Sequence, residues 1–73
     1  MERDVDLAVR HAADLARARG RSLASITLRG AGLASAVEGF ARAALGRLGV
    51  SCGEVRLEVD TGAVRLESIE LDH

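Results

Sequence analysis

Apolar residues recur at helical spacing in two stretches of the chain. Between Val5 and Ala18 they form one stripe at 100° per residue, with arginine and aspartate side chains opposite. This stripe consists of Val5, Ala8, Val9, Ala12, Leu15 and Ala16. The second stripe, between Leu33 and Leu48, consists of Leu33, Val37, Phe40, Ala41, Ala44 and Leu48. The pattern predicts two amphipathic helices, the first ended by Gly20 as its C-cap.

Three shorter stretches alternate between apolar and polar residues, which is typical of strands with one buried face. They are residues 23–29, 54–60 and 63–71. In the first, Ala24, Ile26 and Leu28 share one face, and Ser25, Thr27 and Arg29 share the other. Between the last two, Thr61-Gly62 predicts a tight turn.

A two-residue turn would pair the last two strands so that apolar residues face apolar ones and charges face opposite charges. The predicted pairs are Val59 with Val64, Glu58 with Arg65, Leu57 with Leu66, and Arg56 with Glu67. One extra residue near Glu67 and Ser68, a β-bulge, would keep Ile69 and Leu71 on the apolar face.

The predicted order is α-β-α-β-β, and the predicted fold class is α+β. We expect a single domain over residues 1–73, built as two layers. Its three-stranded mixed sheet would contain a C-terminal hairpin and carry both helices on one face. Either residues 23–28 or residues 63–71 would form an exposed edge strand, which another chain could extend.

The short length leaves this domain with little core. A domain of roughly 60 residues buries only about 60% of its unfolded surface, so small domains are commonly stapled by disulfides or zinc. Cys52 is the only cysteine, and with His11 and His73 it makes three possible ligands, one fewer than structural zinc needs. We therefore predict no metal site and expect oligomerisation or a partner chain to stabilise the fold.

Charge and hydropathy exclude several classes of function. The formal net charge is −1, which argues against general nucleic-acid binding. The chain has no apolar run long enough to span a membrane, and the residues from Met1 to Asp4 do not resemble a signal peptide. With its lone thiol, the protein is expected to be cytoplasmic.

Small residues form a separate stripe on the second predicted helix, consisting of Ser35, Gly39, Ala43 and Gly46. Two glycines on one helix face suggest that another backbone approaches closely, because glycine costs about 1 kcal/mol relative to alanine there. The approaching backbone could be the first helix, through Ala8, Ala12 and Ala16, or a second subunit. Leu7 and Ala18 lie on the polar side of the first helix, where they are either isolated exposed apolar residues or the border of a partner contact.

The segment Gly30-Ala31-Gly32 follows a strand and precedes a helix. It resembles part of the dinucleotide-binding fingerprint, in which small residues let a phosphate reach the helix N-terminus. Gly30, Ala31 and Gly32, helped by Arg29, could therefore bind a phosphate or another small anion. A tight strand-to-helix turn would need the same glycines without any ligand.

Two further patterns could carry chemistry. Residues 59–63 (VDTGA) resemble the catalytic segment of retroviral-type aspartic proteases, although a turn explains them equally well. Cys52 could be a nucleophile only if a base such as His11 lay nearby. On the second predicted helix, Glu38 and Arg42 stand at i,i+4 spacing, which favours an ion pair.

One family shows the same order of elements. The segments 13–20, 23–30, 33–49 and 53–59 resemble, in their apolar and glycine positions, the nickel-binding domain of HypA-type hydrogenase maturation proteins. The resemblance implies a shared scaffold. The Met-His-Glu start of that family is Met1-Glu2-Arg3 here, and its cysteine pairs are absent, so no site residue of the family is carried over.

Spacing brings no pair of titratable groups into one site, so we predict no enzymatic activity and no cofactor. The predicted function is that of a protein-interaction or assembly module, acting as a homo-oligomer or as a subunit of a larger complex. The alternative is an anion-binding module at residues 30–33. Two further alternatives are a relative of the hydrogenase maturation proteins that lacks their metal sites, and an enzyme.

Overall fold

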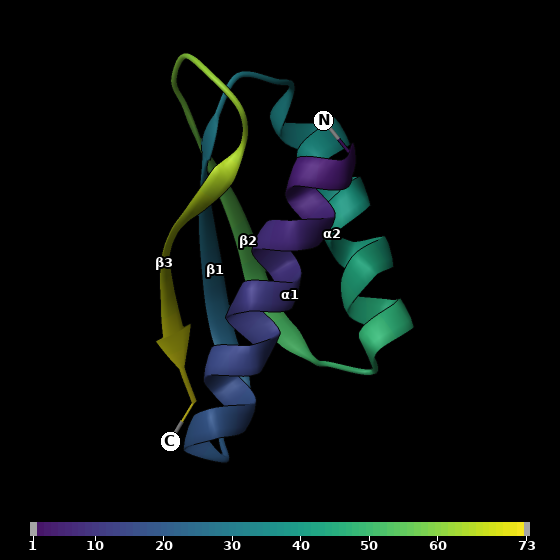
Figure 1. Cartoon of the computed structure of the whole chain (residues 1–73), viewed down its shortest axis with the longest axis vertical. Coiled ribbons are helices and arrows are strands. Elements are labelled where there is room, and N and C mark those ends of the chain that lie inside the picture. Colours follow the sequence, from purple (N-terminus) through teal and green to yellow (C-terminus); the bar gives the residue numbers. More distant parts are fainter. Residues whose placement is uncertain (1, 73) are drawn as a thin grey trace.

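Two helices and three strands follow one another in the computed structural model, which describes residues 2–72 (Figure 1). The elements are α1 (Glu2–Arg19), β1 (Leu23–Gly30), α2 (Ala34–Leu48), β2 (Cys52–Val59) and β3 (Arg65–Leu71). All five predicted elements are confirmed, with small differences at their ends. Met1 and His73, the latter counted above among possible metal ligands, lie outside the described residues.

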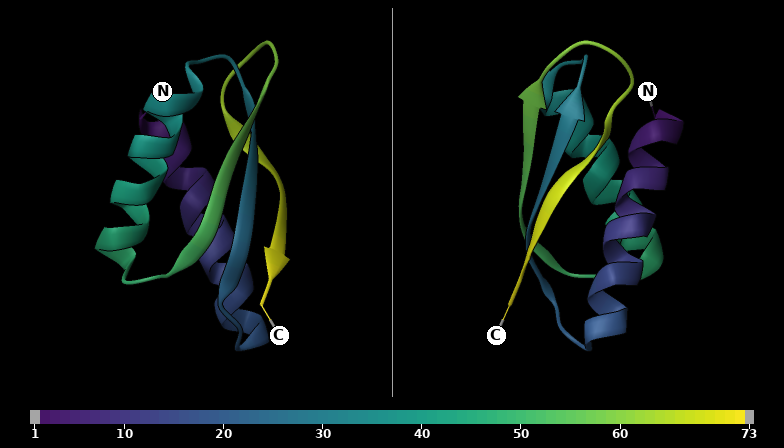
Figure 2. Two further views of the ribbon diagram at one scale, coloured as in Figure 1. Left: turned by 180° about the vertical axis from the view of Figure 1, so that it is seen from behind. Right: turned by 60° about the vertical axis from the view of Figure 1, so that its left-hand side comes forward.

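The elements form two layers, with both helices on one face of the sheet (Figure 2). The strand order is β2-β1-β3, in which β1 is parallel to β2 and antiparallel to β3. Helix α1 packs over β3 and β1, α2 packs over β2, and the helices pack against each other. The two-layer α+β fold with a mixed sheet is therefore confirmed.

The pairing predicted between the last two strands is wrong, because β3 pairs with β1 instead of β2. After Val59 the chain passes the end of β1, where the Asp60 N–H donates to the Gly30 carbonyl at 3.1 Å. The Ala31 N–H donates to the Gly62 carbonyl at 3.0 Å, and the chain then returns along the other edge of β1. Strand β1 is thus central, and β2 and β3 are the edges.

In two of the four predicted pairs, both members flank the same residue of the central strand: Leu57 with Leu66, and Glu58 with Arg65. Leu28 lies between Leu57 and Leu66 in register. Apolar complementarity across the sheet is therefore satisfied with β1 in the middle, and it could not by itself distinguish the two strand orders.

The predicted β-bulge is confirmed. Thr27 pairs with Ser68 and Leu28 with Leu66, which leaves Glu67 as the extra residue. Because of this bulge, the side chains of Leu66, Ile69 and Leu71 all pack against the core.

A second irregularity changes the start of β1. Leu23 pairs with Leu71 and Ser25 with Glu70, so Ala24 is extra in β1. Leu23 is buried in place of Ala24, and Ser25 is also buried, with its Oγ donating to the Glu70 carboxylate at 3.1 Å. The simple alternation predicted for this strand therefore holds only from Ile26 onward.

The core lies between the helices and the sheet and contains many alanines. Its largest fully buried side chains are Ile26, Leu28, Val5, Val9 and Val37. Two leucines predicted to be in the core are not buried: Leu15 is 41% exposed and Leu33 is 73% exposed. Ala13 and Leu45 are buried instead, because each helix turns part of its surface toward the other helix as well as toward the sheet.

Both helices end on glycines with left-handed backbone conformation, Gly20 at φ 63° and Gly49 at φ 68°. The Gly20 N–H donates to the Arg17 carbonyl, which confirms the predicted C-cap of α1. Arg42 does not form the predicted ion pair with Glu38. Its guanidinium instead donates to the carbonyls of residues 52 and 53, at 3.0 and 3.3 Å, and so joins α2 to the start of β2.

Candidate functional site

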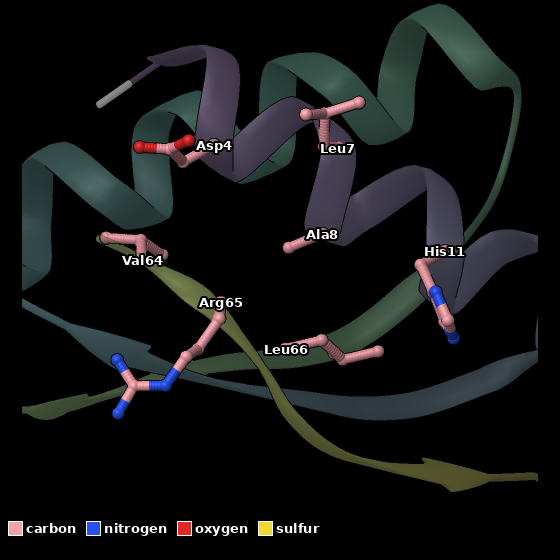
Figure 3. Close-up of a pocket in the computed structure, with 7 residues that line it drawn as sticks. All are labelled: Asp4, Leu7, Ala8, His11, Val64, Arg65 and Leu66. Atoms are coloured by element: carbon pink, nitrogen blue, oxygen red, sulfur yellow. The ribbon is translucent and has the colours of Figure 1, made fainter. Parts of the chain in front are cut away.

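An apolar groove runs between α1 and β3 along one edge of the molecule. Its first part has a volume of about 380 Å³, and Figure 3 shows the residues that line it. They are Asp4, Leu7, Ala8 and His11 from α1, with Val64, Arg65 and Leu66 from the other side. A second hollow of about 410 Å³ lies between Leu15 and Arg19 of α1 and Ile69 and Leu71 of β3. We call these two hollows together the α1–β3 groove.

The spacing of residues in α1 explains the groove. Leu7, His11 and Leu15 are four residues apart, so they form a stripe beside the buried alanines of the same helix. The sheet ends at β3, so no further strand covers this stripe among residues 2–72. As a result, Leu7 is 58% exposed and Leu15 is 41% exposed.

The backbone edge of β3 is also open. Strand β3 forms its ladder with β1 only, and none of the side chains of residues 2–72 bonds to the backbone of Arg65–Leu71. An edge strand of this kind offers a row of N–H and C=O groups to another chain. The groove therefore combines exposed apolar side chains with a strand that can be extended.

A cluster of charges occupies the open face of the sheet around Arg29. Its Nη2 lies 2.6 Å from Glu58 Oε2 on β2, and its Nε lies 3.0 Å from Glu67 Oε2 on β3. Its Nη1 lies 3.5 Å from Asp60 Oδ2 in the turn. The carboxylates of Glu67 and Glu58 raise the pKa of Arg29 above its ordinary value. Arg29 therefore ties both edge strands and the turn to the central strand.

Asp60 holds the turn together. One of its carboxylate oxygens accepts the Thr61 N–H at 2.8 Å, and the other accepts a hydrogen bond from Arg65 at 3.2 Å. The Thr61 N–H, with Arg29 and Arg65 nearby, lowers the pKa of the Asp60 carboxyl. Asp60 is the aspartate of the segment that resembles aspartic proteases. Its carboxylate thus bonds a backbone amide and two guanidinium groups.

We predict that Asp60→Asn makes the protein less stable at neutral pH, and that the difference shrinks as the pH falls. A carboxyl whose pKa is lower in the folded state adds stability above its unfolded pKa, about 3.9 for aspartate. That contribution disappears as the pH falls through the folded pKa, because the carboxyl becomes neutral. Urea unfolding of both proteins from pH 7 to pH 3 measures the difference.

Asp14→Asn is the control for the loss of one negative charge, because Asp14 forms no ion pair within residues 2–72. Equal effects of the two substitutions at pH 7 would contradict the role assigned to Asp60.

The four residues predicted to bind an anion do not converge on one point. The guanidinium of Arg29 is bound to carboxylates on the open face of the sheet. The Ala31 N–H bonds to Gly62, and Gly30 lies against the backbone of Val64. Gly30 therefore lies at a tight crossing of two backbone segments.

The predicted interface residues separate into two groups. Leu7 and Ala18 are exposed on α1, and Leu7 lines the groove. The small residues of α2, which are Ser35, Gly39, Ala43 and Gly46, are all exposed. A Cβ added at either glycine would meet nothing within 4 Å. The stripe therefore does not contact α1, and α2 packs on that helix through other residues.

Cys52 and His11 are not brought together. Cys52 begins β2 at one edge of the sheet, whereas His11 lines the groove beside β3 at the other edge. The Cys52 Sγ lies 3.2 Å from the Glu54 carbonyl, and burial raises the pKa of the thiol. A raised pKa lowers the fraction of reactive thiolate.

Residues 2–72 contain no group of three or more histidine, cysteine, aspartate or glutamate side chains placed to hold a metal ion. In the same part of the chain, neither helix has the length and apolar character needed to cross a membrane. The resemblance to HypA-type proteins stays a prediction. No protein-family model, curated protein or solved structure matches this chain.

Proposed function

We propose that this protein is a non-enzymatic interaction module, which works bound to a second protein chain. The observation that carries the proposal is the α1–β3 groove, where two exposed leucines lie beside an open strand edge. A strand edge supplies affinity through backbone hydrogen bonds, and neighbouring apolar pockets supply selectivity.

The small core supports the same proposal. Six of the fifteen buried apolar residues are alanines: Ala8, Ala12, Ala13, Ala16, Ala41 and Ala44. The chain has one cysteine and therefore no internal disulfide. Burying the groove against another chain would add the apolar burial that so short a domain lacks. We place the module in the cytoplasm, where a single thiol remains reduced.

The test is sedimentation velocity from micromolar to millimolar concentration, together with native mass spectrometry of the protein isolated from its own cells. We expect a species heavier than the 7.7 kDa monomer, containing at least two polypeptide chains. A monomer at every concentration, isolated without any second chain, would overturn the proposal.

A further inference from the structure

We propose that the occupant of the α1–β3 groove is a second copy of this chain, related to the first by a twofold axis. The inference rests on the proposed function and names its partner. In the dimer, β3 pairs antiparallel with β3 of the other copy, and α1 packs antiparallel on the other α1. The two sheets then form one six-stranded sheet with four helices on one face.

The first argument is the charge pattern of α1. Along the groove, the helix presents Asp4, Leu7, His11, Leu15 and Arg19, in that order. With a rise of 1.5 Å per residue, Asp4 lies about 10.5 Å before His11 and Arg19 about 12 Å after it. An antiparallel copy centred on His11 therefore places Leu7 against Leu15 and Asp4 against Arg19, twice.

These two charges have no other ion-pair partner within the described part of the chain. Every ion pair among residues 2–72 is formed by other side chains, for example Asp6 with Arg10 and Arg47. The acidic first turn and the basic last turn of α1 make the antiparallel arrangement favourable along the whole helix.

The second argument is the register of β3. Because Glu67 is the extra residue of the bulge, Leu66 and Ile69 each lie one register position from Ser68. Antiparallel pairing centred on Ser68 thus places Leu66 against Ile69 of the other copy, twice, on the helix side. On the open face, the same register places Arg65 against Glu70 of the other copy.

One axis serves both elements. Helix α1 and strand β3 run in the same direction, since the start of α1 faces Val64 and Leu66 and its end faces Ile69 and Leu71. His11 lies beside Leu66, and Leu15, one turn later, lies beside Ile69, so His11 is level with Ser68 and one rotation reverses both sets of contacts. In a closed twofold interface of this kind, both copies use the same surface, so two copies complete the assembly.

The first experiment reverses the two charges. We expect Asp4→Arg and Arg19→Asp each to raise the dimer Kd about tenfold, because each places two like-charged pairs in the interface. The double variant restores both ion pairs and the wild-type Kd. The double variant carries a positive charge at the start of α1 and a negative charge at its end, which is the least favourable arrangement for the helix dipole. A restored dimer Kd therefore cannot come from a more stable helix.

Glu38→Arg is the matched control, because it changes the charge as Asp4→Arg does but lies exposed on α2. Sedimentation equilibrium of the four variants and the wild type gives the Kd values. A dimer in which the double variant is no tighter than the single ones would overturn the inference.

The second experiment locates the axis by cross-linking. In a Cys52→Ser background, His11→Cys places two thiols at the axis, and a short bismaleimide should link them into a covalent dimer. Ala43→Cys, on the exposed stripe of α2, should stay monomeric.

The outcomes separate this inference from the proposed function. A dimer linked through residue 43 but not through residue 11, or a complex with a different protein and no self-association, would overturn the twofold dimer and leave the interaction module standing. A monomer that binds no other chain would overturn both.

Discussion

Replacing Ile26 by alanine is expected to lower the free energy of unfolding by about 2–5 kcal/mol, the range for large-to-small changes in a core. Ile26 is 0% exposed in the central strand, between Val55 and Ile69 in register. Six of the ten buried residues of the two helices are alanines, whose short side chains cannot fill the space that the isoleucine would leave. The thermal midpoint should fall by about 4–8 °C for each kcal/mol lost, as measured by circular dichroism at 222 nm.

Leu33→Ala is the matched control, because Leu33 loses a side chain of similar size at 73% exposure. We expect its effect to stay within about 0.5 kcal/mol. Both variants are compared at one protein concentration, so that any association contributes equally. Similar losses for the two substitutions would contradict the placement of the core.

Gly30→Ala is expected to destabilise the protein by about 1–3 kcal/mol or more, because it forces extra volume into a packed crossing. A Cβ at Gly30 would lie 2.6 Å from Val64 Cα and 2.9 Å from the Ala63 carbonyl oxygen. These are backbone atoms, so β3 would have to move away from the end of β1. Such a movement would break the hydrogen bonds by which Gly30 and Ala31 hold the connection between β2 and β3.

Gly39→Ala makes the same chemical change where an added Cβ meets nothing. It should stabilise the protein by about 0.5–1 kcal/mol, because alanine is the better helix former. Urea unfolding of the two variants should therefore shift in opposite directions. If Gly30→Ala were also stabilising, the chain could not cross the end of β1, and the predicted hairpin would become the better description of the strand order.

The strand order was the main feature that the hydrophobic pattern did not predict. Alternation within residues 63–71 shows which side chains face the helices, but it is satisfied by either neighbouring strand. One signal did indicate the correct order. Strands β2 and β3 each carry three charged residues or more, whereas β1 carries only Arg29. Charged residues are typical of edge strands, and an apolar strand is expected between them.

The candidate site was only partly predictable for the same reason. Leu7 stood out because it lies on the polar side of its helix, but Leu15 belonged to the apolar stripe and was assigned to the core. Its exposure depends on where the sheet ends, which follows from the position of β3. Gly30 and Gly32 were interpreted as a tight turn or as an anion site, because the sequence does not show that another part of the backbone crosses at Gly30.

The sequence by itself determined the five elements, the C-cap of α1 and the β-bulge, because each depends on the conformations and side-chain periodicity of neighbouring residues. Only the tertiary structure decided that β1 is central, that Arg29 binds carboxylates from both edges, and that α1 and β3 leave a groove between them. These features depend on which distant segments become neighbours, and many segments of this chain have compatible faces. The choice among them was made by the packing of the whole domain.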